Sequence, residues 1–500
     1  MTKKKKKQFG GIDKMVATVS GAVCLFILAA VLNGGLGFNH VLILIAYLVL
    51  VILCLWKLKP ILSFCHNHLK VIRILLIIAI IVGFLLRFSF LAIQDRFSIS
   101  GTLLDTGVHW YGAQQIVDEG NLNEEIGKYE RLFPYLSSYT GLVATSMSIF
   151  GKSYVAVLVL NIFFDLISTI TLYFLIFFWK KKKDLALIAA AVWAINPLQI
   201  IFCGLPLAIV VVNTYIMLSI FSVFLLLNTK NDLVKMCLLS LLCGFVFAFG
   251  NAFRPIFIIF VLAVIVSKLS IVLKEKKCFW KAGISCIVLL VSYFGFGLLP
   301  GVIHEQFNPY YHGEKARAGW GVFVGANYQT KGKWSKEDSE YFFGPVLQEQ
   351  SNGDIEKAQS AIMGVAIDRY KDIIARGELP QHFFNKTELI FGNVENSVYD
   401  LYYDFGIGRE SEGYKILQDI ILVFYLTILI VIGYNIGVAI KVKRNLLSDN
   451  LFFYLDILFV GLFLAFFFVE AMNRYSLPFI AIMVVLSIGF IDKKKQKSMI

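Results

Sequence analysis

Long apolar runs constrain this chain more than any other feature, because many of them reach the roughly 20 residues that a helix needs to cross a bilayer. In lipid, each spanning segment must satisfy its own backbone polar groups, which favours helices. The chain is 58% hydrophobic and 16% charged, with a mean hydropathy of +0.73, so it is too apolar for a soluble protein. We therefore predict an all-α polytopic membrane protein.

Short lysine runs beside the apolar stretches give the orientation, since cytoplasmic turns carry an excess of Lys and Arg. Examples are Lys3–Lys7, Lys180–Lys183 and Lys493–Lys495. Placing every such run inside predicts about 12 transmembrane helices, with both termini cytoplasmic, in a multi-pass protein of the cell (plasma) membrane. The predicted spans are 15–34, 40–57, 71–92, 153–179, 185–203, 206–228, 235–252, 255–273, 279–303, 416–440, 451–470 and 475–491.

Residues 134–150 are apolar enough for a further crossing, but a span there would put Lys180–Lys183 outside. We therefore predict an outer-surface or re-entrant helix over 134–150. A second outer segment holds turn signals and a helical stretch over 354–374. The predicted parts are an N-terminal two-span extension (1–70), a transmembrane core (71–303) with a first outer loop (93–152), an extracytoplasmic loop domain (304–414) and a C-terminal three-span segment (415–500).

Charge and cysteine content exclude several classes of protein. The net charge is +13, yet residues 304–414 hold 17 Asp and Glu against 11 Lys and Arg, so the largest hydrophilic segment is acidic and we expect no nucleic acid partner. Seven of the eight cysteines lie in or beside apolar runs, and Cys65 lies in a short loop predicted to be cytoplasmic. No disulfide framework and no zinc spacing is visible.

The sequence lacks the motifs of nucleotide-binding enzymes. Asp404-Phe405-Gly406 matches a kinase triplet, but no Gly-rich nucleotide loop or catalytic loop accompanies it. The glycines from Gly319 to Gly325 have the wrong spacing for a dinucleotide fingerprint, and phosphate-binding loop and nucleophile-elbow patterns are missing. Soluble kinase, dehydrogenase and hydrolase functions are thereby excluded.

Five ionisable residues stand at predicted outer span ends: Arg87, Asp105, Arg254, Glu470 and Arg474. Charges near membrane depth are costly, so they need a partner or a function. Each arginine could instead extend to water, Glu470 and Arg474 could form a structural i, i+4 pair, and Asp105 could cap a helix or lie in solvent. Three arginines on the face where positive charge is scarce nevertheless favour binding of an anion such as a lipid phosphate.

These residues belong to an ordered series of short motifs. The series is Arg87; Asp105 with Ala113 and Gly120; Phe133-Pro134; Ile149-Phe150-Gly151; Asn161; Ala194-Ile195-Asn196-Pro197; Arg254-Pro255; Gly319-Trp320-Gly321 with Gly325-Ala326-Asn327 and Trp334; and Arg474-Tyr475 with Pro478. In order and topology it resembles the GT-C superfamily of polyprenyl-phosphate-sugar-dependent glycosyltransferases, in the branch of protein O-mannosyltransferases and aminoarabinose transferases. The resemblance covers residues 71–491 and leaves out the first two spans.

The resemblance implies a GT-C-type bundle with outer juxtamembrane helices and a small extracytoplasmic domain. It also implies a sugar donor linked to a polyprenyl phosphate and delivered within the membrane. We expect Asp105 to act as general base on an acceptor hydroxyl, with inversion at the anomeric carbon, while Arg254, Arg474 and Arg87 stabilise the departing lipid phosphate.

Further substrate contacts are expected from Glu470, Tyr475, Trp320 and Trp334, and also Tyr328; for the outer-domain aromatics the alternative is packing onto the bundle. No cofactor and no metal is demanded, although Asp105 and Glu470 could share a divalent cation such as Mg²⁺ or Mn²⁺.

One departure from the family pattern concerns the residues after the Asn-Pro motif. Many relatives carry an outer glutamate there, whereas Cys203 to Asn213 reads CGLPLAIVVVN. The acceptor stays open among a cell-wall polysaccharide, a teichoic acid, another glycan, a lipid headgroup and a protein. Arginine supplies only 11 of the 47 basic residues, a bias typical of AT-rich bacterial genomes, and this favours a wall polymer.

Two other functions compete with this interpretation. A lipid-linked-oligosaccharide flippase or other transporter also fits twelve spans, and Asp165, Asp456 and Asp419 could serve a proton path. Against it stand the missing repeat between halves and the large outer loop. The other alternative is a noncatalytic scaffold for envelope assembly among the membrane lipids.

Overall fold

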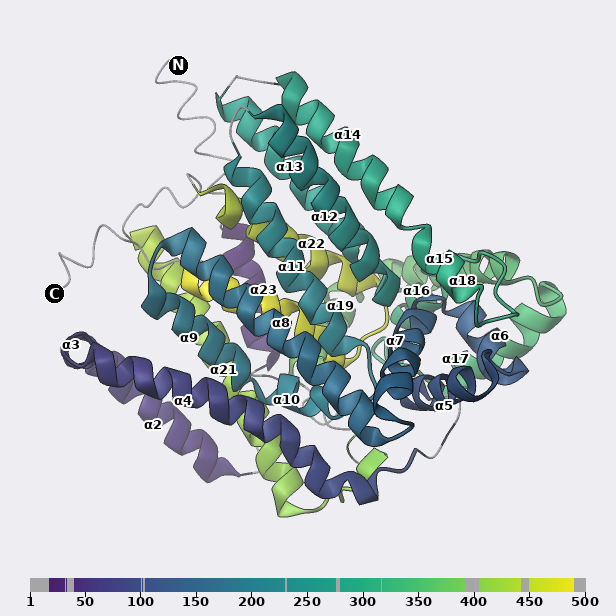
Figure 1. Cartoon of the computed structure of the whole chain (residues 1–500), viewed down its shortest axis with the longest axis horizontal. Helices are drawn as coiled ribbons and strands as arrows, with labels where there is room; N and C mark the ends of the chain where they lie inside the picture. The colour runs from purple at the N-terminus through teal and green to yellow at the C-terminus, as the bar shows by residue number, and fades with distance from the viewer. Residues whose placement is uncertain are drawn as a thin grey trace.

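The computed structural model describes residues 18–31, 33, 40–99, 101, 104–229, 232–275, 279–315, 317–392, 401, 404–441 and 449–489. Within these ranges the secondary structure is helical (Figure 1). The membrane-side helices are α2 (Val41–Trp56), α3 (Leu58–Asn67), α4 (Leu69–Arg87), η1 (Phe88–Arg96), α8 (Tyr154–Lys180), α9 (Lys183–Ala194), α10 (Pro197–Cys203), α11 (Ile209–Asn228), α12 (Leu233–Phe253), α13 (Phe257–Glu275), α14 (Phe279–Phe296), α15 (Leu299–His304), α21 (Glu412–Lys441), α22 (Asn450–Phe468), η6 (Asn473–Ser476) and α23 (Leu477–Gly489). The others are α5 (Asp105–Glu119), α6 (Glu124–Leu132), α7 (Tyr135–Phe150), α16 (Gly319–Gly325), α17 (Lys336–Tyr341), η2 (Phe342–Gln350), α18 (Ile355–Ala375), α19 (Leu379–Thr387) and η3 (Glu388–Gly392).

The chain is a multi-span helical membrane protein, but the predicted count of twelve spans is not reached. Among the described residues, 7 helices are long and apolar enough to cross a bilayer, or up to 8 if one bent pair counts as a single span. Four shorter apolar helices, Thr18–Val31, Leu42–Cys54, Phe257–Leu273 and Arg474–Ile488, coincide with further predicted spans. The count of twelve therefore stays a prediction, because these four fall below the length that a straight crossing needs.

The bent pair is the predicted span over 185–203, which breaks into α9 and α10 with an angle of 54° between them. The break falls at Asn196-Pro197, where proline lacks the N–H that a continuous helix would use. Asn196 instead caps α10, because its side-chain oxygen accepts the N–H of Leu198 at 3.1 Å. The Asn-Pro motif is thus the start of a new helix.

Polar contacts hold together several helix ends that carry the predicted cytoplasmic charges. Arg73 near the start of α4 pairs with Asp184 at the start of α9, at 2.6 Å. Asp449 before α22 accepts from the Trp179 indole at 2.6 Å and lies 3.7 Å from Lys180 of α8. These contacts join ends of α4, α8, α9 and α22 that the lysine pattern assigns to the cytoplasmic face. Both chain termini lie outside the described residues.

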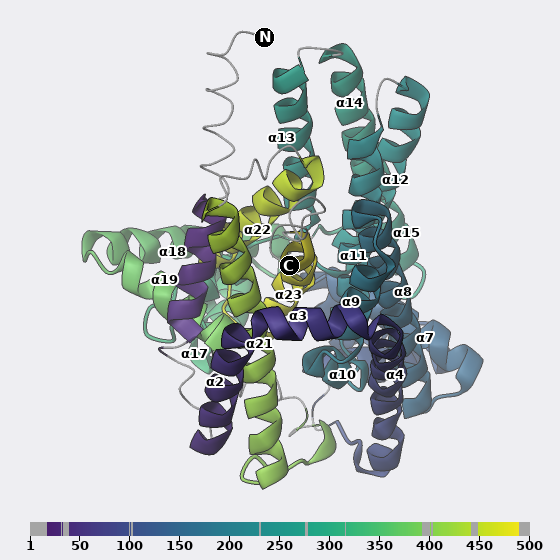
Figure 2. The same cartoon turned by 90° about the vertical axis from the view of Figure 1, so that its left-hand side faces the viewer.

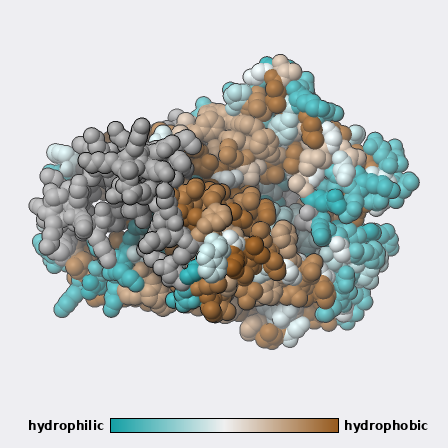
Figure 3. Space-filling view, turned by 90° about the horizontal axis from the view of Figure 1, so that it is seen from above, coloured by the Kyte–Doolittle hydropathy of each residue, from teal (hydrophilic) through white to brown (hydrophobic). Residues whose placement is uncertain are grey.

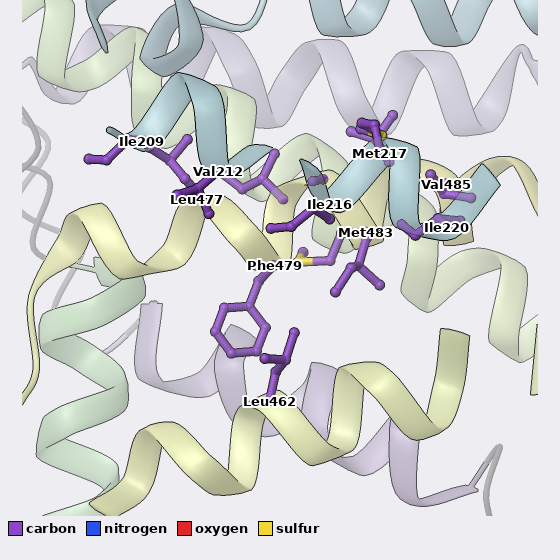
Figure 4. Close-up of a cluster of buried hydrophobic side chains, with 14 of the residues drawn as sticks. Ile209, Val212, Ile216, Met217, Ile220, Leu462, Leu477, Phe479, Met483 and Val485 are labelled. Carbon is purple, nitrogen blue, oxygen red and sulfur yellow. The ribbon is translucent and has the colours of Figure 1, made fainter. Parts of the chain in front are cut away.

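The core of the membrane part lies between α11, α22 and α23 (Figure 4). Ile209, Val212, Ile216 and Ile220 recur every three or four residues and so share one face of α11. This face packs against α23, whose Phe479 also approaches Leu462 of α22 (Figure 4). In lipid such packing stabilises through close van der Waals contact, since no water is expelled. The α11 face ends at the candidate site described below.

A second core joins the two outer segments. Val108, Ile126 and Phe133 of the first segment pack in one cluster with Phe323 and Ile362 of the second. Helix α7, the segment predicted not to span, has 16 residues and buries one side against α5 and α8. Hydrophilic residues collect at the end of the molecule where Figure 1 draws α6, α17 and α18, while apolar residues cover the middle (Figure 3). The predicted helix over 354–374 corresponds to α18.

The short helix α3 runs across the ends of α2 and α4 and connects them (Figure 2). Helix α4 packs against α9 and α10 along one side, although only 6% of its apolar stretch is buried. At Gly83, an added Cβ would come within 2.4 Å of the Ala194 carbonyl oxygen of α9. The glycine therefore lets α4 and α9 meet near their outer ends.

Candidate functional site

A small cavity lies where α5, α7, α11, the end of α12 and η6 meet. Its volume of about 40 Å³ has room for a few water molecules. The polar side chains that line it come from Asp105, His109, Tyr135, Arg254, Arg474 and Tyr475. Ile209 and Val212 of α11 form its apolar floor and continue into the membrane core.

Asp105 is the first residue of α5, where the positive end of the helix dipole favours a carboxylate. Its Oδ2 accepts from the Arg474 guanidinium at 2.5 Å, and the Asp105 side chain is 31% exposed. Burial favours the neutral acid, but the charges of Arg474, His109 and Arg254 outweigh it, so the pKa of Asp105 is lowered from its ordinary value. The carboxylate is therefore ionised at neutral pH.

Arg254 follows the last residue of α12 and precedes Pro255, which favours the extended backbone observed there (φ −157°, ψ 123°). This geometry turns the side chain toward the cavity, where its guanidinium lies 4.0 Å from the centre of the Tyr475 ring. Within the described ranges, Arg254 contacts this ring and has no carboxylate partner. Its charge is available to an incoming anion.

Arg474 and Tyr475 lie in the short helix η6, which directly precedes α23. The Tyr475 hydroxyl donates to Glu470 Oε2 at 2.7 Å. Burial raises the pKa of Glu470, and the hydrogen bond from Tyr475 opposes this only in part. Two guanidiniums thus face one ionised carboxylate, Asp105, together with a second acid that burial drives toward its neutral form.

Residues between Gly321 and Lys386 hold the chain segment that carries Glu470 and Arg474. Glu470 donates its backbone N–H to the Gly321 carbonyl, and Ala471 donates to the Gly332 carbonyl, both at 2.8 Å. The buried Lys386 ammonium donates to the carbonyls of Val469 at 2.6 Å and Gly325 at 2.9 Å. An added Cβ at Gly325 would lie 2.5 Å from the carbonyl carbon of Val469, so only glycine fits there.

The two tryptophans predicted to contact substrate lie away from the cavity lining. Trp320 is half-buried, and its ring packs 5.1 Å from Phe342 and 6.0 Å from Phe323. Trp334 is exposed. Tyr328 packs its ring 5.7 Å from that of His382. The geometry favours packing for Trp320 and Tyr328, and the sugar-stacking role of Trp334 stays a prediction.

Arg87, predicted to join the phosphate site, does not line the cavity. It is fully buried and pairs with Asp165 of α8 at 2.6 Å. Its guanidinium also donates hydrogen bonds to the carbonyls of Gly83 at 2.6 Å and Ala194 at 2.7 Å. This ion pair joins α4 to α8 and α9, so the buried counter-ion Asp165 accounts for the arginine without a ligand.

His109 and Glu130 are the polar residues that the sequence did not single out for a role. His109 stands four residues after Asp105 on α5, a spacing that puts both on one helix face and could have identified it. Glu130 is fully buried, although it ends an acidic stretch that looks solvent-exposed. No pattern in the sequence distinguishes it from Glu124 or Glu125.

The part of the chain that the structure describes contains no cluster of side chains that could ligate a metal ion. No group of three or more His, Cys, Asp or Glu side chains there could hold an ion. The suggestion that Asp105 and Glu470 share a cation therefore rests on these two acids alone.

Comparisons with known proteins give one structural likeness. No family model matches the chain, and no curated protein matches it. Among solved structures, the chain is similar to ArnT from Cupriavidus metallidurans bound to undecaprenyl phosphate. The two are 12% identical, the match covers 83% of this chain and 77% of the ArnT chain, and the TM-score is 0.36.

Proposed function

We propose that the protein is a membrane glycosyltransferase that moves a sugar from a polyprenyl-phosphate donor to an extracytoplasmic acceptor, with inversion at the anomeric carbon. The observation that carries this proposal is the charge arrangement of the cavity. One ionised carboxylate, Asp105, lies beside two guanidiniums, and Arg254 has no carboxylate partner among the described residues. A group transfer that releases a phosphate needs a base and cations of this kind.

The phosphate would lie between Arg254 and Arg474. Guanidiniums bind phosphate oxygens through charge-assisted and often bidentate hydrogen bonds. As the bond between the anomeric carbon and the phosphate oxygen breaks, negative charge grows on that oxygen, and the two arginines stabilise it more than they stabilise the intact donor. The Arg254 guanidinium already lies over the Tyr475 ring, 4.0 Å from its centre, which limits the freedom that it loses on binding.

Asp105 would accept the proton of the attacking hydroxyl, and because Asp105 pairs with Arg474 in this structure, donor binding would have to separate the two side chains. Its lowered pKa keeps it ionised, so it is present as the base at neutral pH. Glu470 and Tyr475, joined by their hydrogen bond, would contact sugar hydroxyls or the phosphate at the cavity wall.

The apolar floor of the cavity supports a lipid-linked donor. Leu207, Ile209 and Val212 line the cavity below the charged residues. A polyprenyl chain would lie along such residues within the membrane while its phosphate reaches the arginines. The cavity of about 40 Å³ is too small for a sugar ring, so donor binding would have to widen it.

The test uses the full-length protein in proteoliposomes with undecaprenyl-phosphate-linked sugars as donors, and follows release of undecaprenyl phosphate. Asp105→Asn should lower the rate by about 10²- to 10⁴-fold. Asp118→Asn is the matched control, because Asp118 lies on the same helix but is half-exposed and pairs with Lys152. An Asp105→Asn protein that transfers sugar at the wild-type rate would remove Asp105 from this role.

The same proteoliposomes distinguish transfer from lipid transport. A fluorescent donor that crosses the bilayer with its sugar–phosphate bond intact would support the flippase alternative and overturn the transferase. Release of undecaprenyl phosphate without transbilayer movement of the donor supports the transferase.

A further inference from the structure

Three buried polar side chains form a hydrogen-bonded series behind Asp105. His109 of α5 lines the cavity, and its Nδ1 lies 3.0 Å from the Thr140 hydroxyl of α7. Thr140 donates to Glu130 Oε1 at 2.5 Å, and Ser137 donates to Glu130 Oε2 at 2.6 Å. His109, Thr140 and Glu130 are at most 1% exposed. The series therefore leads from the cavity to a carboxylate that solvent does not reach.

Glycines bring the three helices close enough for these contacts. An added Cβ at Gly112 of α5 would lie 2.9 Å from the Thr140 methyl carbon, so the glycine lets α5 and α7 approach. An added Cβ at Gly127 of α6 would lie 2.5 Å from the Tyr310 ring, so α6 is held directly against the second outer segment. The Asn308 side chain donates to the Gly127 carbonyl at 3.0 Å and fixes α6 there.

The hydroxyl of Thr140 has a single hydrogen, and this links the states of its two neighbours. When Glu130 is ionised, Thr140 donates to it and accepts from His109 Nδ1–H, which leaves Nε2 as an acceptor. When Glu130 is protonated, it donates to Thr140, and the Thr140 hydroxyl turns to Nδ1 at 3.0 Å, which lies closer than its other acceptor, the Leu136 carbonyl at 3.3 Å. The proton of His109 is then on Nε2. No described side chain bonds Nε2. The protonation of Glu130 thus decides whether His109 offers the cavity an acceptor or a donor.

The charges around the series suit proton transfer. Burial raises the pKa of Glu130 to about 7, although the Ser137 and Thr140 hydroxyls lower it in part. Burial lowers the pKa of His109 to about 4, Asp105 raises it and Arg474 lowers it further. The other titratable groups near the series are the ring of Tyr139 beside His109 and the side chain of Tyr129 beside Asp105. His109 therefore passes protons without remaining charged, and Glu130 accepts them near neutral pH.

We propose that His109, Thr140 and Glu130 form a proton relay that removes the acceptor's proton from Asp105 and holds it on Glu130. The inference rests on the proposed transfer reaction. In that reaction the acceptor O–H bond breaks and the proton passes to Asp105, then directly or through a cavity water to His109 Nε2. His109 gives its Nδ1 proton to Thr140, and Thr140 gives its own to Glu130 Oε1. Asp105 is again a carboxylate, and one proton has moved.

The relay would take the proton away from Asp105, which is too weak a base to hold it. The Arg474 ion pair keeps Asp105 ionised but also makes it a weak base, because its pKa is lowered. A proton left there would return to the acceptor oxygen. Glu130 holds the proton more firmly and lies away from the reacting atoms, so the proton returns to the cavity only after the product has left.

The kinetic test compares four variants over pH 5.5 to 8.5 in the transfer assay. Wild-type kcat should rise through a pKa of about 7 as Glu130 loses its proton. Glu130→Gln and Thr140→Val should lower kcat by about 10²-fold and leave the donor KM unchanged. Both should also lose the rising limb of the kcat–pH profile, which is the increase through a pKa of about 7. Thr140→Ser, which keeps the hydroxyl, should restore both. Ser137→Ala is the matched control, and it should move the limb to higher pH without abolishing it, because one hydrogen bond to the carboxylate is lost. Wild-type kcat and an unchanged limb in Glu130→Gln would overturn the relay.

A second measurement does not depend on turnover. In protein labelled with ¹⁵N-histidine, with His109 assigned from a His109→Gln variant, NMR should find the proton on Nδ1 at pH 8.5 and on Nε2 at pH 5.5. Glu130→Gln should keep one tautomer at both pH values. If wild-type His109 has the same tautomer at pH 5.5 and pH 8.5, the relay is overturned even if sugar is transferred. A pH-dependent tautomer in a protein that transfers no sugar would instead retain the hydrogen-bonded series and overturn the proposed function.

Discussion

The Arg474 guanidinium donates to the Asp105 carboxylate at 2.5 Å, although the two residues are 369 positions apart in the sequence. Each therefore limits what the other can do. A lipid phosphate that binds Arg474 must compete with Asp105, and a hydroxyl that gives its proton to Asp105 must compete with Arg474.

Asp105→Asn should bind undecaprenyl phosphate more tightly than the wild type, even though it transfers sugar more slowly. Removing the competing carboxylate takes away its ion pair with Arg474, and a partly exposed pair of this kind is worth about 1 kcal/mol, which corresponds to roughly 5-fold in the dissociation constant. Titration of the purified protein with undecaprenyl phosphate in detergent measures this. Weaker binding by the variant would mean that Arg474 does not reach the phosphate.

Arg254→Gln should weaken binding of undecaprenyl phosphate by about 10- to 100-fold, because a hydrogen bond to a charged group contributes roughly 1.5–3 kcal/mol. Arg254→Lys keeps the charge but loses the planar guanidinium that contacts Tyr475, so its affinity should be intermediate. Arg317→Gln is the control, since Arg317 lies exposed in the outer segment and pairs with Glu356. Equal affinities for all three variants would exclude Arg254 from the phosphate site.

Arg87→Gln should lower the stability of the protein through the carboxylate that it leaves behind. Asp165 would then be buried without its counter-ion, a change that typically costs about 3–5 kcal/mol. The double variant Arg87→Gln, Asp165→Asn should recover most of the melting temperature, because both charges are gone. Recovery of transfer activity along with stability would show that Arg87 and Asp165 are a structural pair. A stable but inactive double variant would instead support a role of Arg87 in substrate binding.

Lys386→Met should destabilise the segment that carries Glu470 and Arg474. The Val469 carbonyl would lose its donor, at a cost of roughly 1–3 kcal/mol, whereas the Gly325 carbonyl would keep its contact with the His382 ring nitrogen at 2.9 Å. Both the melting temperature and the affinity for undecaprenyl phosphate should fall, while Lys371→Met, at an exposed lysine of α18, should change neither. A normal affinity in Lys386→Met would show that η6 holds its position without the outer domain.

The stability of the protein should depend on pH through Glu130. Its folded pKa of about 7 lies above its ordinary value, so the stabilisation is complete below that ordinary value and is lost as pH rises through about 7. The melting temperature of the wild type should therefore fall relative to that of Glu130→Gln between pH 5.5 and 8.5. The difference between the two proteins isolates this group, and a constant difference would contradict the raised pKa.

Apolar length and lysine position were sufficient to predict a multi-span helical bundle, because both follow from the cost of exposing backbone and charge to lipid. They could not predict the break at Asn196, where a local cap replaces a straight helix. They also predicted spans over 15–34, 40–57, 255–273 and 475–491, where the structure has shorter apolar helices. Chain reversals and caps depend on individual side-chain contacts, which hydropathy averages out.

The candidate site was predictable to the extent that membrane topology brings residues to one face. Asp105, Arg254 and Arg474 were expected on the outer side, and the structure brings all three to one cavity. Arg87 was assigned by the same rule, but its partner lies within an apolar helix where a lone Asp165 gives no sign of its target. The burial of Glu130 could not be predicted either, because it depends on how α6 packs against α7 and the second outer segment, where Gly112 and Gly127 allow close approach.

The pair of Arg87 and Asp165 has a consequence for how the protein is made. Helix α4 leaves the ribosome before α8, so Arg87 reaches the membrane when its counter-ion has not yet been synthesised. An arginine without its counter-ion makes entry into lipid more costly, whereas the rest of α4 favours that entry, because only 6% of its apolar stretch is buried inside the protein. Arg87 can therefore pair with Asp165 only once α8 has followed α4 into the bilayer.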